Sequence, residues 1–495
     1  MKYLIGIDIG TSGTKSVLFN TDGRAIASAT EEYPIYHPKN GWAEEEPADW
    51  WNATCKTLKK LTDKVDPKDI VGLGLSGQMH SLVILDENSR VIRPAILWCD
   101  QRTGEECCEI EEIVGKERLI EITANPALTG FTASKLMWIK KHEPENFGRI
   151  SHILLAKDYI RFMLTGEYAT DVSDASGMQL LDVGKRCWSR EVCEKLGIDM
   201  SKLAAVYESP ELTGRVTREA SALTGLPVGM PVAGGAGDNA AAAIGMGVWR
   251  EGKAFTTVGT SGVVFAPTDR PIIDPDGRVH TFCAAVPNTW HVMGVTQAAG
   301  MSLNWIRRTA LSNRSYREID VECAKLPIGS EKLIYLPYLM GERTPWLDDN
   351  ARGVFFGLSA LHSEYHMARA VMEGVSFSLN DSLEILKGMN IEVSDMALCG
   401  GGGKSGFWRQ MLADVYAIPV KRMESDEGAA LGAAILGGCA AGVYSSVGEA
   451  CEVIARVEEV TEPCSESHVE YKKYYAVYKN LYPRLKEAFK DLRNI

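Results

Sequence analysis

The sequence lacks the features that mark several broad classes of protein. Basic side chains are in the minority, with 53 Lys and Arg against 65 Asp and Glu, and the net charge of −12 argues against a nucleic acid or an anionic membrane as a partner. None of the 12 cysteines stands in a CxxC pair, which indicates reduced thiols in a cytoplasm rather than a disulfide framework. The histidines form no HxH or HExxH set, so a dedicated zinc site is not expected.

Long apolar runs are also missing. The first run of the chain is interrupted by Asp8 and does not read as an export signal. The uncharged stretch from Ala429 to Ser446 is rich in Gly and Ala and too weakly apolar for a membrane span, so it predicts a close-packed internal helix. At 495 residues the chain is too long for one core, and we expect two or three domains of a cytoplasmic protein with no membrane partner.

What the chain does have begins with an unusual first strand, residues 4–10. Apolar side chains occupy one face of this strand, and the other face carries Asp8 between Gly6 and Gly10. An unpaired carboxylate is costly to bury in a strand. Two interpretations remain open from this pattern. Either a metal ion with phosphate approaches the bare backbone beside Asp8, or Asp8 simply starts the Gly-Thr-Ser-Gly turn that follows.

The turn after this strand occurs twice. Gly-Thr-Ser-Gly at 10–13 returns at 259–262, and both copies read as strand, tight turn and strand. Such turns present backbone N–H groups and small hydroxyls to anions. Asp8 in the first copy aligns with Thr257 in the second, so the copies are not equivalent. A duplicated phosphate-binding hairpin predicts two related α/β lobes with a nucleotide between them, although two unrelated glycine turns would give the same four letters.

Two glycine-rich stretches match nucleotide-binding motifs only in part. Residues 72–77 satisfy GxGxxG, but a dinucleotide site requires a helix next and the following segment reads as a strand, so we reject this motif. Residues 400–405 resemble a P-loop, but the first glycine of that motif would fall on Leu398. What remains is a strand ending in a glycine turn before a helix, which lets a ligand approach the backbone closely.

A second candidate carboxylate, Asp238, lies where a strand meets a helix, after Gly237 and before Asn239. It could cap the helix, a role that Asp performs well. It could equally act on a substrate, because the small residues before it and the amide after it leave an open polar pocket that suits a sugar hydroxyl. We expect its carboxylate to be ionised, helped by the helix N-terminus.

Together, these segments resemble the FGGY family of carbohydrate kinases over about residues 1–440, in the same order. The matching segments are residues 5–12, 77–80, 98–100, 235–239, 259–262, 336–345 and 401–405. Glycerol kinases of the family have Gln-Arg-Glu where this chain has Gln78-Met79-His80, which argues against glycerol and for a five-carbon ketose as the substrate. Family members that act on five-carbon ketoses commonly have three glycines before the Asp that corresponds to Asp238, and in this chain the third of these positions is Ala236.

The resemblance implies an α/β fold of two ribonuclease-H-like domains, as in actin-like ATPases and sugar kinases, that flank a catalytic cleft. The expected domains are residues 1–247, which bind the sugar, residues 248–442, which bind the nucleotide, and residues 443–495, a helical tail packed on the second domain. The tail alternates Tyr with basic residues from Ser465 to Ile495, and we favour one docked amphipathic helix over a nucleic-acid surface. The resemblance also suggests a homodimer.

The activity implied by the resemblance is phosphorylation of the C5 hydroxyl of a ketose with ATP and Mg²⁺. Asp238 would be the general base, and Asp8 would hold Mg²⁺ through water, with the two carboxylates facing one another across the cleft. The implied sugar contacts are Met79, His80, Asp238, Asn239, Trp98 and Asp100. The implied ATP contacts are Gly10, Thr11, Ser12, Gly13, Thr14, Gly259, Thr260, Ser261, Gly401, Gly402, Gly403 and Lys404.

Two alternatives stay open from the sequence. One is a sister kinase that acts on another pentulose or a polyol, and the other is an actin-like ATPase without kinase activity. The Asp238–Asn239 pair beside a glycine turn favours a sugar pocket over the second alternative.

Overall fold

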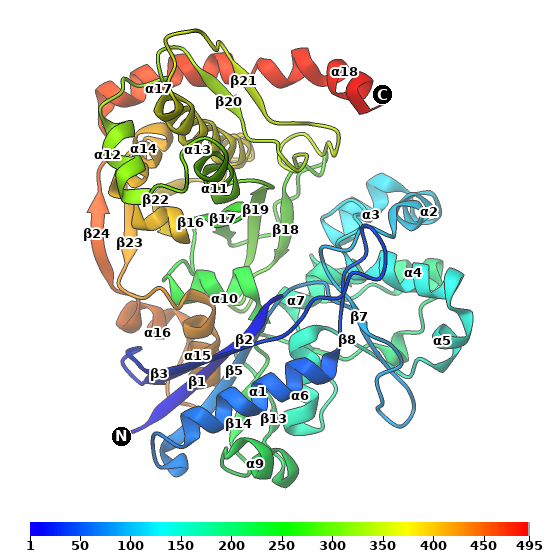
Figure 1. The fold of residues 1–495 in the computed structure, drawn as a ribbon. Coiled ribbons are helices and arrows are strands. Elements are labelled where there is room, and N and C mark those ends of the chain that lie inside the picture. The colour runs from blue at the N-terminus through cyan, green and yellow to red at the C-terminus, as the bar shows by residue number, and fades with distance from the viewer. Residues whose placement is uncertain (494–495) are drawn as a thin grey trace.

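The computed structural model describes residues 1–493, which form two seven-stranded sheets. The first sheet contains β1 (Tyr3–Ile9), β2 (Gly13–Asn20), β3 (Ala25–Glu32), β5 (Ile70–Gly77), β13 (Leu212–Arg215), β14 (Pro231–Ala233) and β15 (Ala236–Gly237). The second contains β16 (Gly252–Val258), β17 (Gly262–Thr268), β18 (His280–Cys283), β19 (Trp290–Thr296), β22 (Val393–Cys399), β23 (Val420–Met423) and β24 (Val457–Thr461). In Figure 1 the second sheet lies above the first.

The two sheets have the same strand order. The first runs β3-β2-β1-β5-β14 and the second β19-β17-β16-β22-β23, so three antiparallel strands are followed by two parallel ones in each. The two Gly-Thr-Ser-Gly turns join β1 to β2 and β16 to β17. The prediction of two related α/β lobes is therefore confirmed.

Two helices cross between the sheets. Helix α10 (Asp238–Gly245) follows the first sheet, and α15 (Gly428–Ala440) follows β23 of the second. Ala430 and Ala434 of α15 pack with Leu4 of β1, whereas Ala243 of α10 packs with Phe255 of β16. Each half therefore packs one helix against the other half, and Figure 1 shows α10 and α15 near the centre of the molecule.

The glycines of β1 and β5 allow α15 to approach. A Cβ atom at Gly6 would lie 1.7 Å from the carbonyl oxygen of Ala430, and one at Gly74 would lie 1.8 Å from that of Ala433. Rejection of the GxGxxG motif is confirmed, because its residues lie in or at the end of strand β5 and its glycines serve helix packing. Of the two glycines that flank Asp8, Gly6 is covered by α15 and cannot admit a ligand, whereas Gly10 is not covered by this helix.

The first half carries a large insertion between β5 and β14, visible on the right of Figure 1. Its helices are α2 (Gly104–Val114), α3 (Lys116–Thr123), α4 (Thr132–His142), α5 (Pro144–Arg149), α6 (Ala156–Thr165), α7 (Val172–Ala175), α8 (Arg190–Leu196) and α9 (Arg218–Thr224). Its short strands are β6 (Val83–Leu85), β7 (Ala95–Ile96), β8 (His152–Leu154), β9 (Ala169–Asp171), β10 (Leu181–Asp182), β11 (Cys187–Trp188) and β12 (Ala205–Tyr207). Before it, β4 (Glu44–Glu45) precedes α1 (Pro47–Thr62), whose first residue is a proline, a favoured position for this residue.

The second half covers its sheet mainly with helices. These are α11 (Gly300–Thr309), α12 (Tyr316–Ala324), α13 (Glu364–Gly388), α14 (Gly406–Tyr416) and α16 (Val447–Ile454), with the hairpin β20 (Ile334–Leu336) and β21 (Val354–Phe356). Helix α15 is buried from Ala430 to Gly438, as its Gly and Ala content predicts. Within residues 1–493, no helix is both long enough and apolar enough to cross a membrane.

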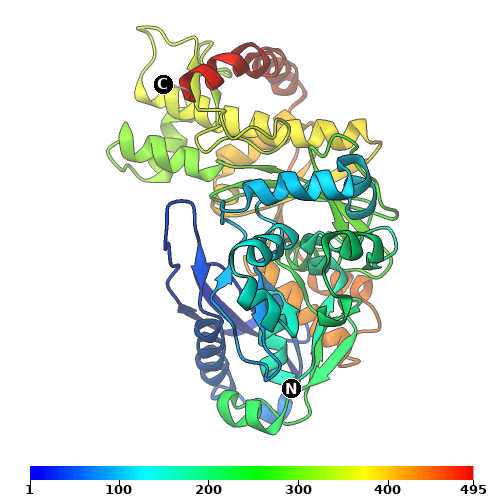
Figure 2. The ribbon, with the colours of Figure 1, turned by 90° about the vertical axis from the view of Figure 1, so that its right-hand side faces the viewer.

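The tail forms two helices rather than the single helix expected from Ser465 to Ile495. Helix α17 (Ser465–Tyr478) and α18 (Leu481–Arg493) lie at the opposite end of the molecule from the N-terminus (Figure 2). Pro483 explains the break, because it has no N–H for a continuing helix but is tolerated in the first turn of a new one. Tyr471 and Tyr478 are buried against Phe377 of α13. Residues 494–495 lie outside the described part of the chain.

Candidate active site

Asp8 lies near the end of β1, with its carboxylate at the edge of the first sheet. The Ser76 hydroxyl on the neighbouring strand β5 donates a hydrogen bond to Oδ1 of Asp8 at 3.0 Å. Burial raises the pKa of Asp8 above its ordinary value, while the Ser76 hydrogen bond and the charge of Lys15 oppose the rise. The group is therefore a partly desolvated carboxylate with one hydrogen-bond donor supplied by the protein.

Asp238 is the first residue of α10, and Gly237 rather than Asp238 is the N-cap. The backbone N–H and the side-chain amide of Asn239 both donate to Oδ1 of Asp238, at 2.7 and 3.0 Å. Within residues 1–493, Oδ2 accepts no side-chain or backbone hydrogen bond. Burial and the charge of Asp8 raise the pKa of Asp238 to about 6, so it is mostly ionised at pH 7 in spite of the shift.

The two carboxylates lie on one edge of one sheet. In the first sheet, Asp8 is level with Ser76 and Ser76 is level with Ala236, two residues before Asp238. Both strands belong to the sheet of the first half. Because the carboxyl ends of parallel strands meet at the same edge, the two carboxylates lie at one edge of this sheet. The two carboxylates come from separate segments of the chain, and the charge of Asp8 contributes to the raised pKa of Asp238.

This pair fits a divalent cation. Two neighbouring carboxylates with pKa values raised by burial gain stability when a cation reduces their repulsion. Among residues 1–493, no group of three or more His, Cys, Asp and Glu could hold an ion by itself. Mg²⁺ bound at Asp8 would therefore keep several waters or phosphate oxygens as ligands, which is its usual coordination in phosphoryl-transfer sites.

Met79 and His80 follow β5 at the same edge. Met79 is buried, and a Cβ atom at Gly237 would come within 3.1 Å of its sulfur, so Met79 lies directly beside the turn that carries Asp238. Nδ1 of His80 lies 2.8 Å from the carbonyl of Gly177. Burial, with the charge of Lys135, lowers the pKa of His80 to about 3. The ring is neutral and donates through Nδ1, which leaves Nε2 as a hydrogen-bond acceptor.

Trp98 and Asp100 have different environments. Trp98 is 41% exposed, and its Nε1–H donates to the Thr11 hydroxyl at 2.9 Å. Asp100 is fully buried and accepts four hydrogen bonds, one from the backbone of Ala43 and three from Arg102. A carboxylate has about four acceptor positions, so none remains for a sugar. Asp100 is therefore a structural residue, and its assignment to the sugar site is wrong.

The first glycine turn is held by protein contacts. Its backbone closes through Gly10 N–H to Gly13 O at 3.1 Å, and Ser12 at its tip is exposed. The Thr11 hydroxyl donates to Gln78 at 3.2 Å, so its proton is directed away from a phosphate. Thr14 is fully buried in β2, where Tyr33 is its side-chain partner. Burial removes Thr14 from the set of ATP contacts.

The second turn leaves its hydroxyls free. Thr260 and Ser261 are exposed, and the turn closes through Gly259 N–H to Ser261 O at 3.1 Å. The first residues of α11 donate their N–H groups to the carbonyls of Gly259 and Thr260. These bonds hold the backbone of the turn against α11 and leave the side chains at its tip available to a ligand.

The third glycine segment packs against the second turn. Residues 401–404 form a 3₁₀ helix, and a Cβ atom at Gly402 would lie 2.4 Å from the Val258 side chain just before that turn. Space around Gly401 is open, since an added Cβ would meet nothing within 4 Å. Lys404 is exposed and pairs with Asp426 at 3.2 Å. A cavity of about 190 Å³ is lined by Gly403 and Lys404 among others.

Two features near these residues are missed by sequence reasoning. Gln78 donates to Glu45 at 2.9 Å, and burial raises the pKa of Glu45 to about 7. Glu45 lies in an acidic run that reads as exposed, so no sequence signal indicates this contact. Arg343 lies in the matched segment 336–345. Its charge also lowers the pKa of His80, although burial and the charge of Lys135 lower this pKa more. Its position beside His80 requires the two halves to come together.

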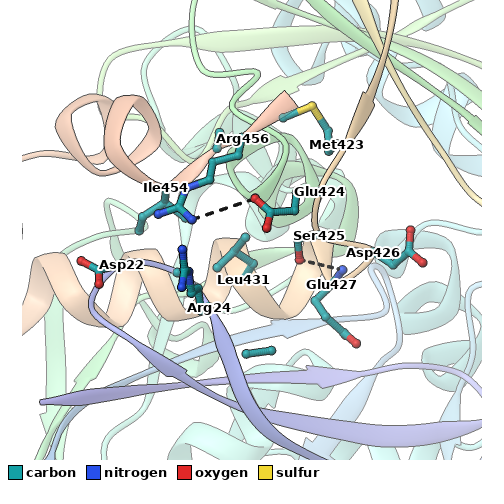
Figure 3. A pocket seen from close by; sticks show the side chains of 14 residues that line it. Asp22, Arg24, Met423, Glu424, Ser425, Asp426, Glu427, Leu431, Ile454 and Arg456 are labelled. Atoms are coloured by element: carbon teal, nitrogen blue, oxygen red, sulfur yellow. Dashed lines mark hydrogen bonds and ion pairs between the residues drawn. The ribbon is translucent and has the colours of Figure 1, made fainter. Parts of the chain in front are cut away.

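A cavity of about 340 Å³ lies at a different place (Figure 3). It is bounded by the β2–β3 turn, the loop before α15 and the end of α16. Arg456 and Glu424 form an ion pair of 4.0 Å at its wall, and neither Asp8 nor Asp238 lines it. Glu427 in this lining instead binds Lys15 of β2, which joins the loop before α15 to the first sheet.

Comparison with known proteins adds a family to this geometry. Residues 3–245 match the N-terminal domain of the FGGY family of carbohydrate kinases, and residues 254–441 match its C-terminal domain. A xylulose kinase of Bacillus subtilis is 39% identical over 496 residues, covering 100% of this chain and 99% of that protein.

Solved structures agree with the fold. A structure described as a xyloylose kinase from Brucella ovis is 37% identical, has a TM-score of 0.92, and covers 98% of this chain and 100% of its own. A gluconate kinase from Lactobacillus acidophilus is 29% identical, has a TM-score of 0.95, and covers 99% of both chains.

Proposed function

This chain belongs to the FGGY family of carbohydrate kinases, and we propose that it transfers the γ-phosphate of ATP to the C5 hydroxyl of D-xylulose, giving D-xylulose 5-phosphate. That it is a kinase that phosphorylates a sugar with ATP follows from the family. The particular sugar and the residue roles are the proposal. The 39% identity to a xylulose kinase over the whole chain supports the choice of sugar.

Asp238 is the proposed general base. Asn239 occupies Oδ1, which leaves Oδ2 without a protein donor and able to accept the proton of the C5 hydroxyl. Its pKa of about 6 is high enough to accept a proton and low enough to keep the group ionised at pH 7. This half-occupied carboxylate, with its raised pKa beside a second carboxylate, is the observation that carries the mechanism.

The other residues bind and orient. Nε2 of neutral His80 accepts a hydrogen bond from a sugar hydroxyl, and Met79 packs beside it. Exposed Ser12, Thr260 and Ser261 line the proposed path of the phosphates, and Gly401 to Lys404 provide the surface for the adenosine. Phosphoryl transfer depends mainly on such alignment and on charge neutralisation. Mg²⁺, when bound through water at Asp8, supplies positive charge to the phosphates.

The test of the base is Asp238→Asn. This variant keeps the shape of the side chain and the fold, and kcat falls about 10²–10⁴-fold with D-xylulose because the base is lost. The matched control is Asp199→Asn, an exposed Asp whose side chain accepts from Ser201 N–H at the start of a short helix. Normal kcat is expected for the control. A kcat for Asp238→Asn within threefold of the unmodified enzyme would remove Asp238 from the mechanism.

The test of the substrate is a panel of ketoses, polyols and sugar acids, with ADP release measured for each. A related structure is described as a gluconate kinase, so the fold alone does not choose among such substrates. The second candidate function is phosphorylation of another pentulose or a polyol, for example ribulose. Higher kcat/KM for D-xylulose than for every other compound is expected, and a higher value for ribulose or gluconate would replace D-xylulose as the substrate.

A further inference from the structure

One short segment of the insertion contacts His80 and the residue just before Asp238. It consists of Asp171, helix α7 (Val172–Ala175) and a 3₁₀ turn (Ser176–Met178), and we refer to residues 171–178 as the support segment. The sequence gives this segment no role. Its contacts reach the turn before Asp238, the ring of His80 and the second sheet.

Ser173 holds the start of α10. Its hydroxyl donates to Oδ2 of Asp171 at 2.6 Å and accepts the backbone N–H of Gly237 at 3.2 Å. Gly237 is the N-cap of α10 and immediately precedes Asp238. Ser173 and Asp171 are fully buried, so the Gly237 N–H has no water to replace the hydroxyl if it is removed.

Asp171 is fixed by a buried ionic cluster. Lys157 lies 2.8 Å from Asp171 and 2.7 Å from Asp158, and Arg161 lies 2.9 Å from Asp158. Arg161 also donates to the carbonyl of Gly234, in the same turn that ends at Asp238. Buried charges of this kind hold one geometry because breaking a single pair leaves an uncompensated charge.

Gly177 holds His80. Its carbonyl is the partner of Nδ1 of His80, and a Cβ atom on Gly177 would lie 2.3 Å from that nitrogen. The backbone of His80 is fixed separately, since its carbonyl accepts from Lys135 at 2.9 Å and Thr132 at 3.0 Å. A side chain at position 177 would therefore displace the ring and leave the backbone of His80 in place.

Ser176 joins the support segment to the second half. Its hydroxyl donates to the Val172 carbonyl at 2.7 Å and accepts the backbone N–H of Cys283, in β18, at 3.1 Å. Ser173 and Ser176 thus use the same pattern, with the proton directed inward and the oxygen accepting a main-chain N–H from another element. The segment is bound at the same time to Gly237 just before the base, to the sugar contact His80 and to the second sheet.

We propose that the support segment is the positioning element of the active site: Ser173 places Asp238, Gly177 places His80, and Ser176 keeps both in register with the second half. The proposal rests on the proposed function, in which Asp238 is the base and His80 contacts the sugar. It predicts that the two roles separate on mutation, because Ser173 and Gly177 act on different residues.

Kinetics of two variants and two controls test the separation. Ser173→Ala lowers kcat about 10–100-fold and changes the KM for the sugar less than about threefold, because a base misplaced by about 1 Å still leaves the sugar bound. Gly177→Ala raises the KM for the sugar about tenfold or more, because His80 is displaced. Ser209→Ala is the control for Ser173, since Ser209 is equally buried and also donates to Asp171, at 2.8 Å. Gly148→Ala, where a Cβ meets nothing within 4 Å, is the control for Gly177.

Both controls keep kcat and KM within about twofold, and Tm is recorded for every variant. If Ser173→Ala does not fold, Ser173→Cys, which keeps a weaker acceptor of similar size, takes its place. An equal loss of kcat in Ser173→Ala and Ser209→Ala would mean that the cluster matters only for stability and would overturn the proposal. So would an unchanged KM in Gly177→Ala.

A readout without turnover separates this proposal from the proposed function. Crystal structures of Ser173→Ala and Gly177→Ala show a shifted Gly237–Asp238 turn and a rotated His80 ring respectively, and ¹⁵N NMR shows loss of the Nδ1–H hydrogen bond in Gly177→Ala. If the unmodified protein phosphorylates no sugar on the panel, the proposed function fails while these structural tests still decide the positioning role. Unmoved turn and ring in both variants would overturn it.

Discussion

The two Gly-Thr-Ser-Gly hairpins have the same sequence and different surroundings. In the first, Ile9 pairs with Thr14 and four residues form the loop, whereas in the second Val258 pairs with Gly262 and three residues form it. The first is preceded by Asp8, which faces the active site. The second is preceded by Thr257, whose hydroxyl accepts the N–H of Val263 and stays within its own hairpin. Asp8 therefore gives the first hairpin a charged side chain, whereas Thr257 gives the second hairpin a neutral one.

The neighbouring elements also divide the hydroxyls. In the first turn, Trp98 and Gln78 occupy the Thr11 hydroxyl, and Tyr33 is the partner of buried Thr14. In the second turn, α11 binds only the backbone carbonyls and leaves Thr260 and Ser261 exposed. The comparison shows that a shared motif predicts a shared backbone shape but not which of its side chains are free to bind a ligand.

The largest expected effect comes from replacing Asp8 of the first hairpin with Thr, the residue at the aligned position 257 of the second hairpin. Asp8→Thr removes the carboxylate and leaves a hydroxyl, and kcat/KM falls about 10²–10³-fold because a charged group at the transferring phosphate is lost. The response to Mg²⁺ also weakens, which a Mg²⁺ titration of the initial rate measures. Thr257→Ser in the second hairpin, as the matched control, keeps normal rates. An Asp8→Thr enzyme with more than a tenth of the normal activity would contradict the asymmetry.

The next effect concerns stability at aligned positions of the two sheets. Gly6 of β1 aligns with Phe255 of β16, and the backbone of α15 lies directly against Gly6. Gly6→Ala is expected to reduce the free energy of unfolding by about 3 kcal/mol, because the carbonyl of Ala430 cannot move without shifting α15. Urea denaturation measures the loss. Gly148→Ala is the control and keeps or slightly increases stability, and a stable Gly6→Ala protein would mean that α15 is loosely packed.

The pH dependence follows from the pKa of Asp238. Since the ionised form is the base, kcat falls about tenfold per pH unit below about pH 6, where the pKa of Asp238 lies. The raised pKa also means that ionised Asp238 destabilises the folded state. Asp238→Asn therefore stabilises the protein by about 1–3 kcal/mol above pH 6, and this gain is lost as the pH falls from 6 to below 4, where the unfolded group is protonated as well.

Thermal denaturation of Asp238→Asn between pH 3.5 and 8 checks the sign. Asp199→Asn, at an exposed Asp, serves as the control. A gain in Tm that is larger at pH 4 than at pH 8 would contradict the raised pKa.

The smallest expected effect compares the two turns directly. Ser261→Ala removes an exposed hydroxyl and raises the KM for ATP about fivefold, which corresponds to about 1 kcal/mol. Thr11→Val leaves the KM for ATP within about twofold, because the Thr11 hydroxyl is already used by Trp98 and Gln78. Steady-state kinetics with varied ATP measure both. Equal effects at the two positions would show that the turns bind phosphate in the same way.

Local patterns predicted the parts of the fold that depend on near neighbours. The two Gly-Thr-Ser-Gly hairpins and the internal helix α15 follow from composition and turn residues close in sequence. The break in the tail was missed, although Pro483 marks it as a residue that cannot continue a helix. The two carboxylates stand out because Asp is unusual at the end of a strand and useful at the start of a helix.

Contacts between distant segments could not be predicted in this way. Asp100 and Thr14 belong to motifs that otherwise match, and only the fold shows that both are buried, Asp100 with the N–H of Ala43 on its carboxylate and Thr14 beside Tyr33. Gly6 resembles an opening for a ligand, and only α15, more than 400 residues later, shows what fills it. The support segment has no unusual residue, and its role depends on contacts with Gly237, His80 and Cys283.

The sequence alone indicated two halves of one strand pattern, each with a glycine turn, and singled out Asp8 and Asp238 as the candidate carboxylates. These facts are local, because turn geometry and strand alternation act over a few residues. The tertiary structure decided that both carboxylates share one edge of one sheet and which hydroxyls and carboxylates remain free. The physical reason is that burial and hydrogen-bond partners depend on segments hundreds of residues apart, which no local pattern encodes.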